Sequence, residues 1–310
     1  MSTLNAVNTN EFLLRRLEKP KGKIDVVIDT DTFNEVDDQF ALAYLIRSSD
    51  KLNLKAIYAA PFTNQKAATP AEGMEKSYQE IANILKLCGR EDYLSVTYRG
   101  STAYLSDEKT PVVSPAAENL VERAMAQPDD QPLYVVAIGA ITNVASALLL
   151  KPEIAKKIVL VWLGGHAWYW PDTREFNLIQ DVAAARVVFG CGVPLVQLPC
   201  MGVVTHFTTT GPELEHWIVG KNELCDYLYR IVKEDEEVRC GKVLWSRVIW
   251  DVTAVAWLLD EDFTLDRIVH SPIVSYDGHY SHDEQRHLMK YVYYVDRDKV
   301  FADLFRKLAE

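Results

Sequence analysis

The chain of 310 residues has few cysteines, no excess of basic residues and no long apolar run. Its five cysteines are odd in number and show no C-x-x-C spacing, which is typical of reduced thiols in a cytoplasmic protein. The net charge of −11 argues against nucleic acid or an anionic membrane as a partner. No segment approaches the roughly 20 apolar residues of a membrane-spanning helix, and the first residues lack the basic and apolar blocks of a signal peptide. We therefore expect a cytoplasmic protein that binds neither nucleic acid nor membranes.

The composition and its distribution along the chain indicate one large domain. Hydrophobic residues make up 48% of the chain, which is enough for a sizeable core. Residues 1–22 are polar and end in Lys-Pro-Lys-Gly-Lys, so we expect an N-terminal tail or short leading helix there and the domain over 23–310. Internal repeats and low-complexity segments are absent from the sequence.

Strand-like and helix-like segments alternate from Ile24 onward, which predicts an α/β fold with a mostly parallel, Rossmann-like central sheet flanked by helices. The expected strands are 24–29, 53–60, 132–138, 158–163 and 194–198. The expected helices between them are 37–48, 70–88, 115–127, 142–150 and 181–190. The C-terminal half is more elaborate and largely helical, with helices at 212–218, 222–239, 250–259 and 297–309 and paired strands at 268–276 and 287–295.

The most informative segment is 24–41, where an apolar strand ends in four aspartates within ten residues. These are Asp29, Asp31, Asp37 and Asp38, and a helical pattern follows directly. The end of a strand before a helix places carboxylates at the ligand-binding edge of an α/β sheet. Four like charges this close repel one another unless a cation offsets them. The segment therefore predicts a site for a hard divalent metal.

Three further loops carry polar residues after expected strands. The first holds Asn64, the second runs from Ala137 to Asn143, and the third continues from Gly164 and His166 to Glu175 and Asn177. In a parallel sheet these loops open on the same edge. Thr142 or Asn143 is positioned to cap a helix. The combined site is rich in carboxylates and amides, which suits a metal and a polyhydroxylated ligand.

Five separated blocks resemble the calcium-dependent nucleoside hydrolases. They are D-T-D-x-x-x-x-x-D-D at 29–38, G-A-I-T-N-V-A-S-A-L at 139–148, L-G-G at 163–165, E-F-N at 175–177 and W-D-V-T-A-V-A-W-L-L at 250–259. Their order and spacing match along nearly the whole chain. The resemblance implies hydrolysis of the N-glycosidic bond of ribonucleosides, Ca²⁺ as cofactor, and a homo-oligomer, either a dimer or a tetramer.

The resemblance also implies a role for individual residues. Asp31 would bind Ca²⁺ and deprotonate the attacking water, with further metal ligands from Asp38, Asp251 and the main-chain carbonyl of Ile138. Asp29 would orient these ligands from behind. The residues implied to bind the sugar hydroxyls are Asp37, Asn64, Glu175 and Asn177. These assignments suit Ca²⁺, which takes about 6–8 oxygen ligands, and a reaction through an oxocarbenium-like state.

The chain departs from part of the family at three places. Trp250 stands before Asp251 where many members have histidine, and this resembles the purine-preferring branch, in which tryptophan stacks on the base. Trp168, Trp170 or Trp245 is a candidate for the opposite face of the base. The gap between Asp31 and Asp37 has five residues rather than the usual three, so Phe33, Asn34 and Glu35 are candidates to enter the site. An asparagine for the 5′-hydroxyl is missing after Gly165, and His166 or Arg174 is a candidate to replace it.

Two other interpretations stay open from the sequence. The missing histidine and the long aspartate loop also fit a nucleoside- or ribose-binding protein that has lost catalysis. The D-x-D after a strand also fits a phosphohydrolase of the haloacid dehalogenase type, although Phe33 stands where that family has threonine or valine.

Overall fold

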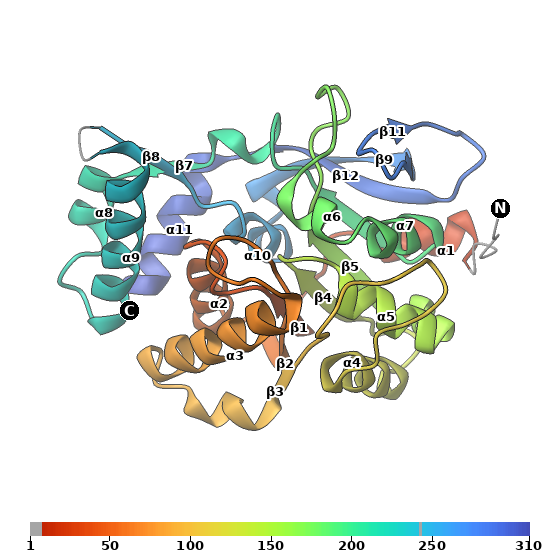
Figure 1. Cartoon of the computed structure of the whole chain (residues 1–310), viewed down its shortest axis with the longest axis horizontal. Helices are drawn as coiled ribbons and strands as arrows, with labels where there is room; N and C mark the ends of the chain where they lie inside the picture. Colours follow the sequence, from red (N-terminus) through yellow and green to blue (C-terminus); the bar gives the residue numbers. More distant parts are fainter. Residues whose placement is uncertain (1–7, 242–243) are drawn as a thin grey trace.

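A computed structural model describes residues 8–241 and 244–310. Its centre is an eight-stranded sheet in the order β3-β2-β1-β4-β5-β6-β12-β9, in which every neighbouring pair is parallel except β12 and β9 (Figure 1). The strands are β1 (Ile24–Thr30), β2 (Leu52–Ala59), β3 (Thr97–Arg99), β4 (Leu133–Ala137), β5 (Ile158–Leu163), β6 (Leu195–Leu198), β9 (Thr264–His270) and β12 (Leu288–Val295). This architecture confirms the expected α/β fold with a mostly parallel sheet.

Helices cover both faces of the sheet. The helices are α1 (Asn10–Arg16), α2 (Asp38–Arg47), α3 (Pro70–Leu87), α4 (Pro115–Ala126), α5 (Thr142–Leu150), α6 (Phe176–Gln180), α7 (Val182–Gly190), α8 (Gly211–Trp217), α9 (Glu223–Cys240), α10 (Val252–Leu259) and α11 (Arg297–Ala309). Apolar residues of α2, α3, α10 and α11 form one core layer, and those of α4, α5 and α7 form the other. Figure 1 shows these two groups on opposite sides of the sheet.

The alternation of side chains along β1 decides which layer each residue joins. Val26 and Ile28 pack in the layer of α2, whereas Val27 packs in the layer of α5. Asp29 has the same parity as Val27 and therefore faces α5. Because the strand is buried on both faces, the aspartates at its end are carried into the interior rather than to the surface.

Smaller elements complete the fold. The pair β7 (Thr208–Thr210) and β8 (Ser246–Val248) is antiparallel, as is the pair β10 (Ile273–Val274) and β11 (Tyr280–Ser281). Short 3-10 helices lie at η1 (Glu91–Val96), η2 (Pro152–Lys156), η3 (Val204–His206) and η4 (Glu261–Phe263). Among the described residues, no helix is long and apolar enough to cross a membrane.

Two expectations need correction at their boundaries. The strand expected over 268–276 ends at His270, because Pro272 has no N–H to continue the ladder, and β10 follows as a separate strand. The helix expected from Trp250 begins at Val252, which leaves Trp250 and Asp251 in the loop before it.

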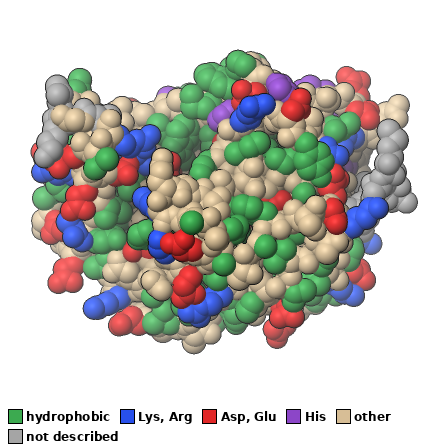
Figure 2. Space-filling view, in the orientation of Figure 1, with side chains coloured by type: hydrophobic (Ala, Val, Ile, Leu, Met, Phe, Trp, Pro, Cys, Tyr) green, Lys and Arg blue, Asp and Glu red, His purple; other side chains and the backbone are tan. Residues whose placement is uncertain are grey.

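The expected N-terminal tail lies partly outside the described residues, since nothing is described before Asn8. Its remainder contains α1, with Leu13 and Leu17 fully buried in the layer of α2. We retain one domain over 23–310 as a proposal, with the leading helix packed against it. On the face drawn in Figure 2, acidic and basic side chains of the described residues are interspersed, unlike a basic nucleic-acid-binding surface.

Candidate active site

The site begins at the end of β1, where all four aspartates are buried. Asp29 lies in the strand, Asp31 follows it, and Asp37 and Asp38 stand at the start of α2. The Thr30 hydroxyl donates a hydrogen bond of 2.5 Å to Oδ1 of Asp38. A carboxylate at a helix N-terminus is also favoured by the helix dipole. The local sequence therefore accounts for the position of Asp38, whereas the other three need partners from elsewhere in the fold.

Three carboxylates from two distant segments converge at this point. Asp37, Asp38 and Asp251 each offer one oxygen atom, and these atoms all lie within 4.8 Å of one another. Asp251 is brought there by α10, which packs beside α2 in the same core layer. Carboxylate oxygens at this separation match the ligand preference of a hard cation such as Ca²⁺.

Asp31 is the most unusual acid of the group. Both of its carboxylate oxygens are buried, and neither has a hydrogen-bond partner among the described residues. Gly139 allows the loop after β4 to pass this close, because a Cβ atom there would lie 3.1 Å from the Asp31 Cγ atom. A buried carboxylate without donors is costly, so Asp31 indicates a missing partner such as a cation or a water molecule.

The pKa values of the cluster are raised in the absence of a cation. Burial raises the pKa of Asp37 to about 8 and of Asp38 to about 6, with neighbouring negative charges adding to the effect. Burial and the charges of Asp38 and Asp37 hold the pKa of Asp31 well above its usual range. Burial and the same neighbours do so for Asp251. A bound divalent cation would reverse this balance and allow all four groups to ionise.

The loops after β4 and β5 supply main-chain and amide groups. Asn177 donates from Nδ2 to the carbonyl oxygens of Ile138, at 3.2 Å, and Leu163, at 3.0 Å. This fixes the Ile138 carbonyl that the family resemblance assigns to the metal. The amide oxygen of Asn177 stays available as an acceptor for a ligand.

Glu175 has a structural task at this site. Its two carboxylate oxygens accept hydrogen bonds from the backbone N–H groups of Asn177, Leu178 and Gly165 at 2.8–2.9 Å. It thereby caps α6 and joins the two ends of the loop that holds His166. Burial raises the pKa of Glu175 despite these bonds. The Glu175 side chain thus caps α6 and also lines the cavity.

Thr142 or Asn143 was expected to cap the helix after β4, and the structure corrects this for both. Helix α5 begins at Thr142, the cap position is Ile141, and no side chain caps it. Asn143 instead donates to Oδ1 of Asp29 at 2.7 Å and accepts from the N–H and the hydroxyl of Ser101 at 2.7 and 2.8 Å. Burial nevertheless raises the pKa of Asp29 to about 7. Asn143 therefore supports the acidic cluster, through a contact between residues that are far apart in the sequence and close in the fold.

Apart from Asp29 and Asn143, the acidic and amide residues of the site line one cavity of about 180 Å³. Its remaining wall is less polar and includes Leu163, Phe176, Met201 and Trp250. His166 also lines it, and the Nδ1 atom of His166 accepts a hydrogen bond from the N–H of Met201 at 3.3 Å. Burial lowers the pKa of His166, which favours the neutral ring, and a ring that accepts at Nδ1 carries its proton on Nε2. The cavity thus combines an acidic end with an apolar wall and a donor.

The structure places most of the predicted residues around this cavity. The predicted residues that line it are Asp31, Asp37, Asp38, Ile138, His166, Glu175, Asn177, Trp250 and Asp251. Asn64 lies one contact behind the wall, where its Nδ2 donates to Oδ1 of Asn34 at 2.8 Å. Arg174 turns away and donates to the carbonyl of Asp277. The role of Asn64 at the sugar stays a prediction.

The tryptophans expected opposite Trp250 lie elsewhere. Trp168 donates to Gln197 and packs against Tyr291, and Trp245 packs at Gly211. Trp170 lies edge-on to His166, with 6.4 Å between the ring centroids. Phe176 is the aromatic residue that lines the cavity together with Trp250. Phe176 is the middle residue of the E-F-N block at 175–177. The sequence identifies that block but does not show that its phenylalanine lines the cavity.

Fold and site together define an α/β protein with a buried, oxygen-rich acidic cluster at the carboxyl edge of its sheet. The model of the family described as inosine-uridine preferring nucleoside hydrolase matches residues 26–302. The chain belongs to this family, which confirms the resemblance at that level. The assignment leaves no support for a haloacid dehalogenase-type phosphohydrolase.

Individual relatives agree with this assignment. The non-specific ribonucleoside hydrolase RihC of Salmonella paratyphi A is 29% identical over 205 residues, which are 65% of this chain and 61% of that protein. RihC of Salmonella enteritidis PT4 is 30% identical over the same shares. The match thus spans about three fifths of the length of these relatives.

Solved structures show the same fold. A plant nucleoside hydrolase, the PpNRh1 enzyme, matches with a TM-score of 0.72 at 20% identity and covers 94% of this chain and 99% of its own. A purine-preferring ribonucleoside hydrolase from Gardnerella vaginalis matches with a TM-score of 0.73 at 20% identity, over 92% and 98%.

Proposed function

We propose that this chain hydrolyses the N-glycosidic bond of ribonucleosides to free base and ribose, with Ca²⁺ as its metal and a preference for purine nucleosides. The observation that carries the proposal is the buried Asp31, which has two oxygens without hydrogen-bond partners among the described residues and lies in one cavity with the Asp37, Asp38 and Asp251 cluster. Asp31 would serve as a metal ligand in a ribose-binding protein as well, so turnover in the test below is the result that separates catalysis from binding alone.

The residues fit Ca²⁺ because every group offered is an oxygen. Asp31, Asp38, Asp251 and the Ile138 carbonyl would hold it. When bound, Ca²⁺ lowers the pKa of a coordinated water and holds vicinal sugar hydroxyls. Asp37, with Asn177 through its amide oxygen, would bind the ribose hydroxyls. Asp29, held by Asn143, supports the arrangement from behind.

In the reaction, Asp31 takes a proton from water as the water oxygen attacks C1′ of the ribose. The bond between C1′ and the base nitrogen breaks, and its electron pair goes to the base. The surrounding carboxylates stabilise positive charge on the sugar ring in the transition state. Trp250 stacks on the departing purine, which then takes up a proton from solvent.

We also expect a homo-oligomer, as a dimer or a tetramer.

The test is release of free base from a panel of ribonucleosides, with Ca²⁺ and then with excess chelator. Chelator-sensitive release from inosine, adenosine or guanosine, with little from uridine or cytidine, is the expected result. Asp31→Asn should lower kcat at least about a thousandfold with the fold intact. Asp25→Asn is the matched control, because Asp25 lies on the same strand at its opposite end and pairs with Lys55. Full activity in Asp31→Asn would refute the role of Asp31, and no base release by the unmodified protein would refute the function.

A further inference from the structure

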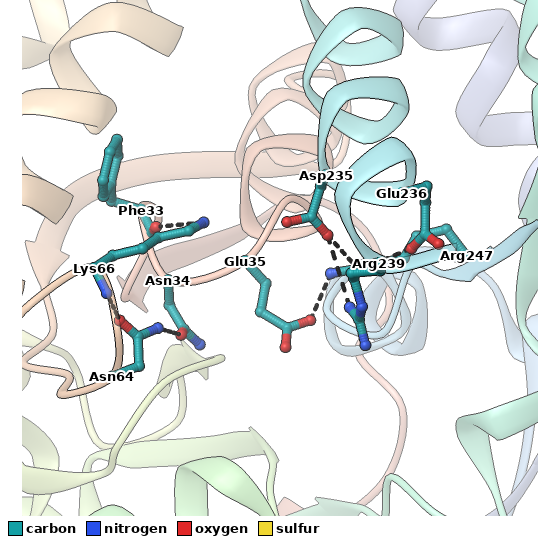
Figure 3. A network of polar contacts seen from close by, with 9 residues as sticks. All are labelled: Phe33, Asn34, Glu35, Asn64, Lys66, Asp235, Glu236, Arg239 and Arg247. Carbon is teal, nitrogen blue, oxygen red and sulfur yellow. Dashed lines mark hydrogen bonds and ion pairs between the residues drawn. The ribbon is translucent and has the colours of Figure 1, made fainter. Parts of the chain in front are cut away.

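The long loop between Asp31 and Asp37 is held on both sides. On one side, Asn34 accepts from Asn64, and the Lys66 ammonium donates to the Phe33 carbonyl at 3.3 Å. On the other side, Oε2 of Glu35 accepts from Nη2 of Arg247 at 2.6 Å (Figure 3). These contacts hold the loop at both ends of the segment from Phe33 to Glu35, and Asn34 and Glu35 form part of the cavity wall.

Arg247 is the centre of the second set of contacts. Its side chain is only 5% exposed, and its Nη1 atom lies 2.8 Å from Asp235 and 3.0 Å from Glu236, both on α9. A planar guanidinium with carboxylates on two of its nitrogens is held rigidly, because each hydrogen bond restricts the plane of the group. Figure 3 shows Glu35 reaching Arg247 from the aspartate loop and Asp235 reaching it from α9. Arg247 therefore fixes where the Glu35 carboxylate lies.

Glu35 and Asp235 share this partner but differ in their surroundings. Glu35 lines the cavity together with Asn34, Asp37 and Trp250, whereas Asp235 is not among its lining residues. The Glu35 side chain is still 39% exposed, and its second carboxylate oxygen is turned away from Arg247 in Figure 3. An ionised carboxylate only accepts hydrogen bonds, so a group that meets this oxygen has to be a donor.

We propose that Glu35 is a substrate-binding residue that accepts a hydrogen bond from a donor of the nucleoside, and that Arg247 is the positioning residue that holds it. The proposal rests on the proposed function and deepens it. Besides the 2′- and 3′-hydroxyls, which the proposed function assigns to Asp37 and Asn177, a nucleoside offers two kinds of donor, the 5′-hydroxyl of the sugar and an N–H of the base. The same carboxylate disfavours an added phosphate by repulsion between like charges.

The test compares Glu35→Gln with Asp235→Asn by initial rates of base release from inosine. Both variants remove a carboxylate from Arg247, so both lose an ion pair to that group, and Asp235→Asn also loses the 3.7 Å ion pair of Asp235 with Arg239. Loss of a hydrogen bond to a charged acceptor should raise KM about tenfold in Glu35→Gln, with kcat within about twofold. Asp235→Asn should keep KM within about twofold. Equal changes in the two variants, or no change in Glu35→Gln, would overturn the proposal.

Two analogues distinguish the donors. If the 5′-hydroxyl is the donor, Glu35→Gln should lose nothing in kcat/KM toward 5′-deoxyinosine. If the base N–H is the donor, the loss should vanish with purine riboside, which has no N–H on its base. An equal loss with inosine and both analogues would show that Glu35 contacts neither group, against the proposal. Failure of the proposed function is a separate result, since it would appear as no base release by the unmodified protein.

Discussion

The acidic cluster makes the stability of the metal-free protein depend on pH in an unusual direction. An aspartate in an unfolded chain has a pKa near 3.9, whereas in the folded protein burial raises the pKa of Asp37 to about 8 and of Asp29 to about 7. Between these values the folded state holds protons that the unfolded state has lost. The contribution of each group to stability is therefore complete below about pH 4 and is lost as pH rises toward the folded pKa.

The effect of Asp37 on stability is best measured between about pH 6.5 and about pH 8. Below this window, His287 acts in the opposite direction, since burial lowers its pKa to about 4, so its contribution grows as pH rises to its ordinary value. Each proton retained by the fold costs about 1.4 kcal/mol per pH unit as pH rises, so Asp37 alone should remove about 2 kcal/mol of unfolding free energy across this window. In a chain of this length that corresponds to a fall of roughly 3 °C in Tm.

The assay is thermal unfolding in chelator and in excess Ca²⁺ at several pH values in this window. A bound cation keeps the carboxylates ionised in the folded state, so the pH dependence should flatten and the gain in Tm from Ca²⁺ should grow with pH. Asp37→Asn should reduce the slope seen in chelator, whereas Asp107→Asn, in an exposed loop, should leave it unchanged. A chelated protein whose Tm is flat or rises over the window, with Asp37→Asn unchanged from it, would refute the reasoning.

Two substitutions test other parts of the site. Asn143→Ala removes the hydrogen-bond partner of the buried Asp29 carboxylate and of the Ser101 N–H. Denaturant unfolding should therefore show that the free energy of unfolding falls by about 3–5 kcal/mol. A fall below about 1 kcal/mol would contradict the supporting role of Asn143. Trp250→Ala should lower kcat/KM for inosine about tenfold or more and change uridine far less, which removes the purine preference. Equal losses for both nucleosides would instead make Trp250 a packing residue.

Much of the fold is predictable from the sequence because the strands of this sheet are buried on both faces. The apolar runs around Val26, Val135 and Leu160 are continuous, and helical patterns follow them along the chain. The three-residue strand β3 is too short to show any period. The antiparallel strand β9 alternates only weakly, so its start at Thr264 is visible only from its pairing with Val295.

That Asp38 and Asp251 lie close together was predictable from the sequence blocks that resemble the family, while their roles as metal ligands stay predictions. Other parts of the site were not predictable where a side chain is used by a segment far away in the sequence. Nothing near Asn143 shows that its amide reaches Asp29, more than a hundred residues earlier. Likewise the sequence shows the extra length of the aspartate loop but not its attachment to Arg247, since that contact depends on how α9 and β8 pack. Spacing along the chain carries no information about such contacts.

The extra loop length and the buried arginine are best understood as one unit. Six carboxylates line the cavity, from Asp31, Glu35, Asp37, Asp38, Glu175 and Asp251, and no lysine or arginine is among its lining residues. A further carboxylate beside Asp37 would add to this repulsion if it stood alone. Arg247 sits behind the wall, where its charge offsets Glu35 without taking the place of a cation in the cavity. An arginine buried there without Glu35, Asp235 and Glu236 would be equally costly. The loop and β8 are therefore joined by one ion-pair network, which supports the proposed role of Glu35 as an acceptor at the cavity wall.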